Sequence, residues 1–103
     1  MTDPMKIRAT IEAGFTELKV FMSHPMETGM HKDALGGTAA AHYITEISAT
    51  CAGNVVLQCR FSQFVAKNPY LAFKFKGGAI GDQLQVRWLD NLGEKRTDTV
   101  TLE

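Results

Sequence analysis

Apolar and polar residues alternate with a period of two along most of this chain. Ile7, Ala9 and Ile11, for example, are separated by charged residues and threonine. Because successive side chains of a strand point to opposite faces, each apolar set would line one face of a sheet. Further sets with this spacing are Leu18, Val20 and Met22; Tyr43, Thr45, Ile47 and Ala49; Val55, Leu57, Cys59 and Phe61; Leu71, Phe73 and Phe75; Leu84, Val86 and Trp88. No stretch follows a helical period, so the pattern predicts an all-β chain.

Turn-forming residues separate these runs at short intervals. They are Ala13-Gly14, Ala52-Gly53-Asn54, Lys67-Asn68-Pro69, Lys76-Gly77-Gly78 with Gly81-Asp82, and residues 90–93. About seven short strands with such spacing are typical of an immunoglobulin-like β-sandwich with antiparallel strands, and a small barrel is the alternative. With 103 residues, the chain fits a single domain over residues 1–103.

The hairpin at residues 52–54 allows a prediction of register. A three-residue loop places Cys51 opposite Val55 and Ile47 opposite Cys59, which keeps the apolar residues on one face. In either register the two cysteines are not opposite one another. At ~3.4 Å per residue they lie more than about 10 Å apart, which is too far for a disulfide. We therefore expect two reduced thiols, with Cys59 in the core.

The connection over residues 23–41 is long for a compact domain, and such loops are usually functional or disordered. Together with the preceding strand it supplies thioether and imidazole groups, which suit copper as ligands. The side chains concerned are Met22, His24, Met26, Met30 and His31. A blue-copper pattern fails because no histidine follows His42. We favour packing and hydrogen-bonding roles for these side chains, and a stand-alone copper-binding domain is the alternative function.

No set of residues forms a recognisable catalytic site. A nucleophilic site needs a base within reach, but Cys59 is expected to point inward and Cys51 has no base near it in the sequence. The Gly77-Gly78 pair lies between two strands and does not match a phosphate-binding loop. The 11 basic and 11 acidic residues cancel, which argues against nucleic-acid binding. We predict a binding protein that is not an enzyme and has no catalytic residues, metal or cofactor.

The apolar runs are too short for a membrane-spanning segment. The N-terminal residues Met-Thr-Asp-Pro-Met-Lys have no apolar core or cleavage site, so we expect no signal peptide. Taken alone, this start predicts a cytoplasmic protein.

Two long segments resemble the SoxZ family of the bacterial sulfur-oxidation (Sox) system. They are residues 22–29 (MSHPMETG) and residues 67–78 (KNPYLAFKFKGG). Residues 3–10, 41–44, 81–82 and 88–93 agree as well, so that the resemblance spans nearly the whole chain.

The resemblance implies an immunoglobulin-like β-sandwich that forms a heterodimer with SoxY. In that complex a cysteine in the Gly-rich C-terminal arm of SoxY carries the sulfur intermediates of thiosulfate oxidation, and the SoxZ subunit is non-catalytic. This chain ends in TVTLE, without such an arm. The resemblance also implies the periplasm, reached by export with a signal-bearing SoxY, and so reverses the cytoplasmic expectation. It assigns no role to Cys51 or Cys59.

We expect two segments to contact SoxY or, transiently, the other Sox enzymes. The predicted partner-binding residues are His24, Pro25, Met26, Glu27, Thr28, Gly29, Asn68, Pro69, Tyr70, Lys74, Lys76, Gly77 and Gly78. Turn and strand-start roles for the prolines and glycines stay open. Phe21 and Leu89 lie opposite the apolar sets of their strands, where a partner would bury them. The isolated chain is therefore expected to form a homo-oligomer or to be less stable than the heterodimer.

Overall fold

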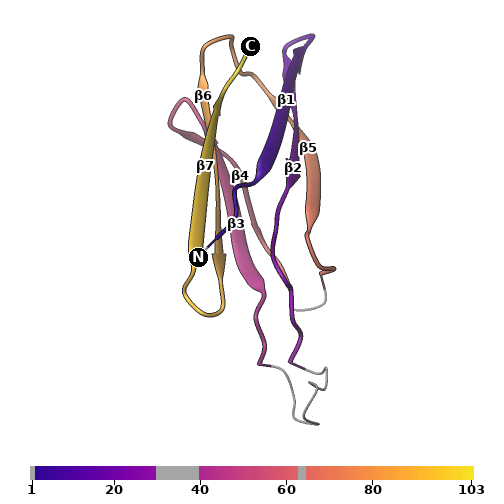
Figure 1. Ribbon diagram of the computed structural model, residues 1–103. Helices are drawn as coiled ribbons and strands as arrows, with labels where there is room; N and C mark the ends of the chain where they lie inside the picture. Colours follow the sequence, from indigo (N-terminus) through magenta and orange to yellow (C-terminus); the bar gives the residue numbers. More distant parts are fainter. Residues whose placement is uncertain (1, 30–39, 63–64) are drawn as a thin grey trace.

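Seven strands make up the secondary structure of the residues that the computed structural model describes, 2–29, 40–62 and 65–103. In chain order they are β1 (Lys6–Glu12), β2 (Phe15–Phe21), β3 (Ile44–Cys51), β4 (Asn54–Arg60), β5 (Tyr70–Lys76), β6 (Gln83–Asp90) and β7 (Lys95–Thr101). They form two antiparallel sheets, one in the order β1-β2-β5 and the other in the order β4-β3-β6-β7 (Figure 1). The predicted all-β sandwich of about seven antiparallel strands is confirmed. None of the described residues belongs to a helix that could cross a membrane.

The core lies between the two sheets and consists mainly of the alternating apolar residues. Leu18 and Val20 of β2 join Ile47 of β3 and Val86 and Trp88 of β6 in one cluster, and each is at most 1% exposed. Burial of one such side chain contributes roughly 1.5–3 kcal/mol. The edge strands β1, β4, β5 and β7 add half-buried residues to this cluster. The period-two pattern therefore identified most of the core.

The hairpin between β3 and β4 differs from the predicted three-residue loop. Its turn contains only Ala52 and Gly53, both with positive φ (50° and 84°), and Cys51 pairs with Asn54 instead of Val55. A bulge after Ala49 adds one residue on β4 and restores the predicted pairing of Ile47 with Cys59. The apolar face is kept in this way, but Val55 lies outside it and is 65% exposed.

A second irregularity shifts the core face at the start of β3. The pattern predicted that Thr45 shares a face with Ile47, yet Ile44 is the buried residue, with 0% exposure. The register of the pairing with β6 shifts by one residue between Ile44 and Glu46, as at a β-bulge. The extra residue on β3 reverses the alternation there, so that Ile44 and not Thr45 points into the core.

Gly77 and Gly78 follow β5 at the end of the sandwich opposite to the start of β3 (Figure 1). Thr16 is fully buried, and its hydroxyl donates a hydrogen bond of 2.7 Å to the carbonyl of Gly77. Gly78 has a φ of 89°, and a Cβ at this position would overlap the Thr16 hydroxyl. A tight connection is thus one role of both glycines.

Candidate functional site

His24 is the buried centre of the loop that follows β2. Its side chain packs edge-on against the Trp88 indole, with ring centroids 5.0 Å apart, and the residue is 3% exposed. Its backbone N–H donates to Oδ1 of Asn68 at 3.1 Å, and its carbonyl accepts from the Asn68 N–H at 2.9 Å. The two segments predicted to contact a partner, residues 24–29 and 67–78, are therefore hydrogen-bonded to each other.

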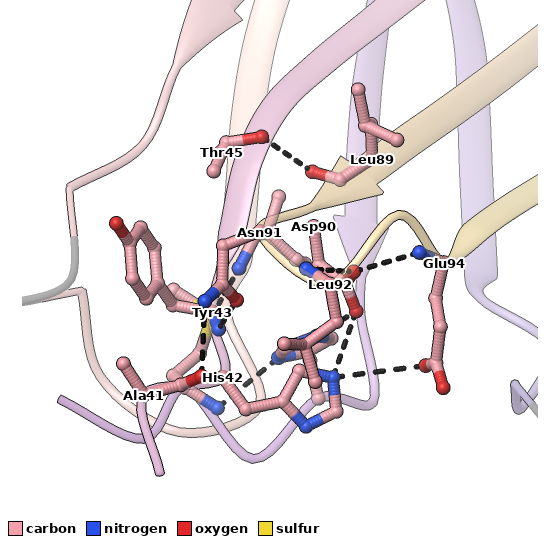
Figure 2. A network of polar contacts seen from close by, with 12 residues as sticks. Ala41, His42, Tyr43, Thr45, Leu89, Asp90, Asn91, Leu92 and Glu94 are labelled. Atoms are coloured by element: carbon pink, nitrogen blue, oxygen red, sulfur yellow. Dashed lines mark hydrogen bonds and ion pairs between the residues drawn. The ribbon is translucent and has the colours of Figure 1, made fainter. Parts of the chain in front are cut away.

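Asp90, at the end of β6, accepts hydrogen bonds with both carboxylate oxygens. Its Oδ2 atom lies 3.1 Å from Nε2 of His24 and 2.8 Å from Nε2 of His42. Its Oδ1 atom accepts from the backbone N–H groups of Leu92 and Glu94 at 3.0 and 2.8 Å (Figure 2). Burial alone would raise the pKa of Asp90, but these donors outweigh burial and hold the pKa below its ordinary value.

Backbone and side-chain bonds also attach the residues before β3 to this site. Glu27 and His42 exchange two backbone hydrogen bonds, of 2.6 and 2.8 Å. The Asn91 side chain accepts from the Tyr43 N–H at 2.8 Å and donates to the Ala41 carbonyl at 2.9 Å (Figure 2). The loop after β2, the approach to β3 and the β6–β7 turn thus form one hydrogen-bonded end of the sandwich, at the bottom of Figure 1.

The hydrogen bonds determine which ring nitrogen of His24 carries a proton. Its Nδ1 atom accepts from the backbone N–H of Met26 at 3.1 Å and is therefore unprotonated. The proton of the neutral ring lies on Nε2, and this N–H donates a hydrogen bond to the Asp90 carboxylate. Burial lowers the pKa of His24, and the bond to Asp90 offsets this only in part, so the ring is neutral at pH 7.

His24, His42 and Asp90 place three potential ligand atoms within 4.8 Å of one another, a spacing that suits a metal ion. The hydrogen bonds argue against this use. A neutral histidine that binds a metal through Nε2 carries its proton on Nδ1 and donates it to an acceptor. In His24, however, Nδ1 faces the backbone N–H of Met26. If Nε2 bound a metal, the Nδ1–H and the Met26 N–H would both be donors and would repel each other. We interpret the cluster as a hydrogen-bond network that fixes the loop.

The described residues of the copper alternative are packed inside the chain. Met22 and Met26 are 3% and 4% exposed and belong to the core cluster. The sulfur of Met26 already accepts from the backbone N–H of Ile44 at 3.3 Å. Met30 and His31 lie outside the described residues. The copper function stays a prediction, and the positions of Met22, His24 and Met26 do not favour it.

A family model described as "Sulphur oxidation protein SoxZ" matches residues 5–101. The chain belongs to the SoxZ family. The matched range includes all seven strands and the network around Asp90. A crystal structure of superoxide reductase in the oxidised state is similar to this SoxZ-family chain, with a TM-score of 0.66 and 20% identity over 96% of this chain and 86% of the other. At this identity the likeness shows the fold alone. No curated protein matched the chain.

Both cysteines of this SoxZ-family chain are free thiols, as the spacing predicted. Cys51 is 5% exposed, and Cys59 is half-buried opposite Ile47. Burial raises the pKa of both thiols, and the nearby Asp82 carboxylate raises that of Cys51 further. Neither is therefore activated as a nucleophile.

The predicted partner-binding residues of the SoxZ-family chain fall into three groups by burial. His24, Met26 and Pro69 are buried; Glu27, Thr28, Gly29 and Gly78 are half-buried; Pro25, Asn68, Tyr70, Lys74, Lys76 and Gly77 are exposed. A buried residue can act on a partner only through the position of its neighbours. The partner contacts themselves stay a prediction. His42 and Asp90 were not among the predicted site residues, although both lie in segments that carry the family resemblance.

Proposed function

We propose that this chain is the non-catalytic subunit of a periplasmic sulfur carrier complex and binds a SoxY chain. The SoxY cysteine carries the covalent sulfur intermediates of thiosulfate oxidation. The observation that carries this proposal is the SoxZ-family match over residues 5–101. Family membership makes this a sulfur-oxidation protein, and the partner and the compartment are the proposed steps beyond it.

The chemistry of the described side chains supports a binding role. The His24–Asp90 pair resembles part of a catalytic triad, but the Nε2–H of His24 donates a hydrogen bond to Asp90 and Nδ1 accepts one from the backbone N–H of Met26. No ring nitrogen of His24 is left to act as a general base. Because the pKa values of Cys51 and Cys59 are raised, a covalently held sulfur atom is better placed on the partner.

Co-expression with SoxY from the same organism tests the proposal, with an affinity tag on SoxY only. We expect the two chains to co-elute as a 1:1 complex in size-exclusion chromatography with light scattering. After incubation with thiosulfate and the loading enzymes, mass spectrometry should find the sulfur adduct on SoxY only. A SoxY variant with serine for its arm cysteine is the matched control, and it should bind this chain but carry no adduct.

Two results would contradict the proposal. One is a monodisperse monomer that does not co-elute with SoxY. The other is a sulfur adduct on Cys51 or Cys59. Tight binding of Cu(I) by the isolated chain, measured by isothermal titration, would instead favour the copper alternative.

A further inference from the structure

The outer face of the three-stranded sheet carries the exposed aromatic residues of the described chain. Phe15, Phe21 and Tyr70 are 49%, 44% and 52% exposed. Phe21 pairs with Tyr70 across β2 and β5, with ring centroids 4.6 Å apart. The opposite face of β2 supplies Leu18 and Val20 to the core, so these aromatic rings are not needed to fill it. Aromatic residues in such positions are typical of protein interfaces.

The same face is basic, although the whole chain has no net charge. Five basic residues lie on it against two acidic ones. They are Lys6, Arg8, Lys19, Lys74 and Lys76, with Glu12 and Glu17. Glu17 contacts both Lys19 and Lys74, at 3.5 and 3.8 Å. Within the described part of the chain no ion pair was found for Lys6, Arg8 or Lys76.

The pairing of Arg8 with Lys19 places two like charges opposite each other on this face, and the contact of Lys19 with Glu17 offsets this repulsion only in part. The two residues are direct cross-strand partners in β1 and β2, and both are exposed. Like charges in this position are destabilising. A partner carboxylate placed between them would turn the repulsion into two attractive contacts, so the pair is suited to an acidic partner.

The outer face of the four-stranded sheet is more polar than that of the three-stranded sheet. Its groove of about 620 Å³ is lined mainly by polar residues, including Glu46, Gln58 and Arg87, and no described aromatic residue is exposed there. Leu89 also lines this groove, so a partner on the three-stranded sheet would cover Phe21 but not Leu89, contrary to the expectation from the sequence. The three-stranded sheet instead has a hollow of about 490 Å³ beside Phe15. Of the two faces, the three-stranded one combines apolar anchors with unpaired charge.

We infer that the outer face of the β1-β2-β5 sheet is the surface on which SoxY docks. The SoxY surface that meets it carries carboxylates opposite Arg8 and Lys19 and an apolar patch against Phe21 and Tyr70. This inference rests on the proposed function, because it assigns the surface to SoxY. Three residues that the sequence predicted to bind the partner, Tyr70, Lys74 and Lys76, lie on this face.

An Arg8→Glu variant separates binding from folding. The introduced carboxylate would face Lys19 as an opposite charge, so the unfolding midpoint of the isolated chain should rise by roughly 2–4 °C. Binding to wild-type SoxY, measured by isothermal titration, should weaken at least about tenfold. Arg87→Glu on the other sheet is the matched control, because it changes the net charge equally and should leave the affinity unchanged.

A Phe21→Ala, Tyr70→Ala double variant tests the apolar part of the surface. We expect at least about a tenfold loss of affinity for SoxY, and Val55→Ala on β4 is the control that should bind as the wild type does. Raising the salt concentration should weaken wild-type binding more than that of the Arg8→Glu variant.

The outcomes distinguish this inference from the proposed function. If the wild-type chain does not bind SoxY, the proposed function fails and the inference fails with it. If the wild-type chain binds SoxY and the Arg8→Glu and double variants bind equally well, only the surface is wrong. If the substitutions dissociate a homodimer of this chain but leave SoxY binding unchanged, the face is a homodimer interface and the inference is overturned.

Discussion

The Nε2 atom of His24 lies 3.1 Å from Oδ2 of Asp90, although the two residues are 66 positions apart in the sequence. The contact joins the loop after one sheet to the end of a strand in the other sheet. Because Asp90 also binds His42 and two backbone N–H groups, one carboxylate organises this whole end of the sandwich.

Replacement of His24 by alanine should destabilise the fold. The substitution removes a donor to a buried carboxylate together with the ring that packs on Trp88. We expect a loss of roughly 2–3 kcal/mol in the free energy of unfolding, measured with urea. His42→Ala is the comparison and should cost about 1 kcal/mol, since water can reach its 26% exposed side chain. Equal losses in both variants would contradict the central position given to His24.

Stability should decrease when the pH falls below 6.5, the ordinary pKa of histidine. In the fold, burial lowers the pKa of His24, so the unfolded chain takes up a proton before the folded chain does. The contribution of the neutral His24 ring to the free energy of unfolding is complete above pH 6.5, and it is lost as the pH falls toward the lower pKa that His24 has in the folded state. The pKa of Asp90 is also lowered, but its contribution is lost only below its ordinary value of 3.8.

Urea unfolding of the wild type at about pH 7.5 and about pH 5.5 measures this effect. A His24→Gln variant should show a smaller difference between the two conditions. An unchanged difference would mean that another group causes the pH dependence.

Zinc should not stabilise the chain, despite the spacing of His24, His42 and Asp90. The Met26 N–H holds Nδ1 of His24 in the unprotonated form, which opposes a metal bond through Nε2. We expect nitrogen NMR shifts to place the ring proton on Nε2 and the unfolding midpoint to stay constant when zinc is added. A midpoint that rises in the wild type but not in His42→Ala would show that a metal does bind.

Gly78→Ala should be more harmful than the same change at Gly81. Both residues have positive φ, 89° and 94°, but only at Gly78 would the new Cβ meet the Thr16 hydroxyl. We expect losses of roughly 2–4 kcal/mol at Gly78 and about 1–2 kcal/mol at Gly81, measured by urea unfolding. Similar losses would show that backbone conformation alone is responsible.

Replacement of both cysteines by alanine should leave sulfur transfer intact. Cys51 and Cys59 are partly or fully buried, with raised pKa values, so the chain should need neither thiol for chemistry. We expect a stability loss of roughly 1–2 kcal/mol and unchanged thiosulfate oxidation in a reconstituted Sox system. Lost oxidation in a variant that still binds SoxY would assign a role to one of the thiols.

The sequence predicted the strands well because alternation is a local property. Leu18, Val20 and Trp88 were placed in the core from spacing alone, and all three are buried. The bulges were missed, since one extra residue on β4 or at the start of β3 leaves no local signal. Tertiary pairing decides which of Ile44 and Thr45 turns inward.

The candidate site was predicted only in part, because its contacts are long-range. For His24 the sequence favoured a packing and hydrogen-bonding role over copper binding, and the residue is buried against Trp88. Its expected contact with a partner stays a prediction. Asp90 was interpreted as part of a turn, which its bonds to the Leu92 and Glu94 backbone confirm. Nothing in the spacing of the chain indicated that this turn residue would also meet two histidines.

The edge-on contact between Trp88 and His24 has a practical consequence for spectroscopy. Trp88 is the sole tryptophan of the sequence, so the indole fluorescence of the unlabelled protein comes from this one position. Its emission wavelength and intensity depend on whether the His24 ring is seated against it. The chain therefore contains an intrinsic optical probe at the point where the loop after β2 meets β6, and the effect of acidification on His24 can be followed there without a dye.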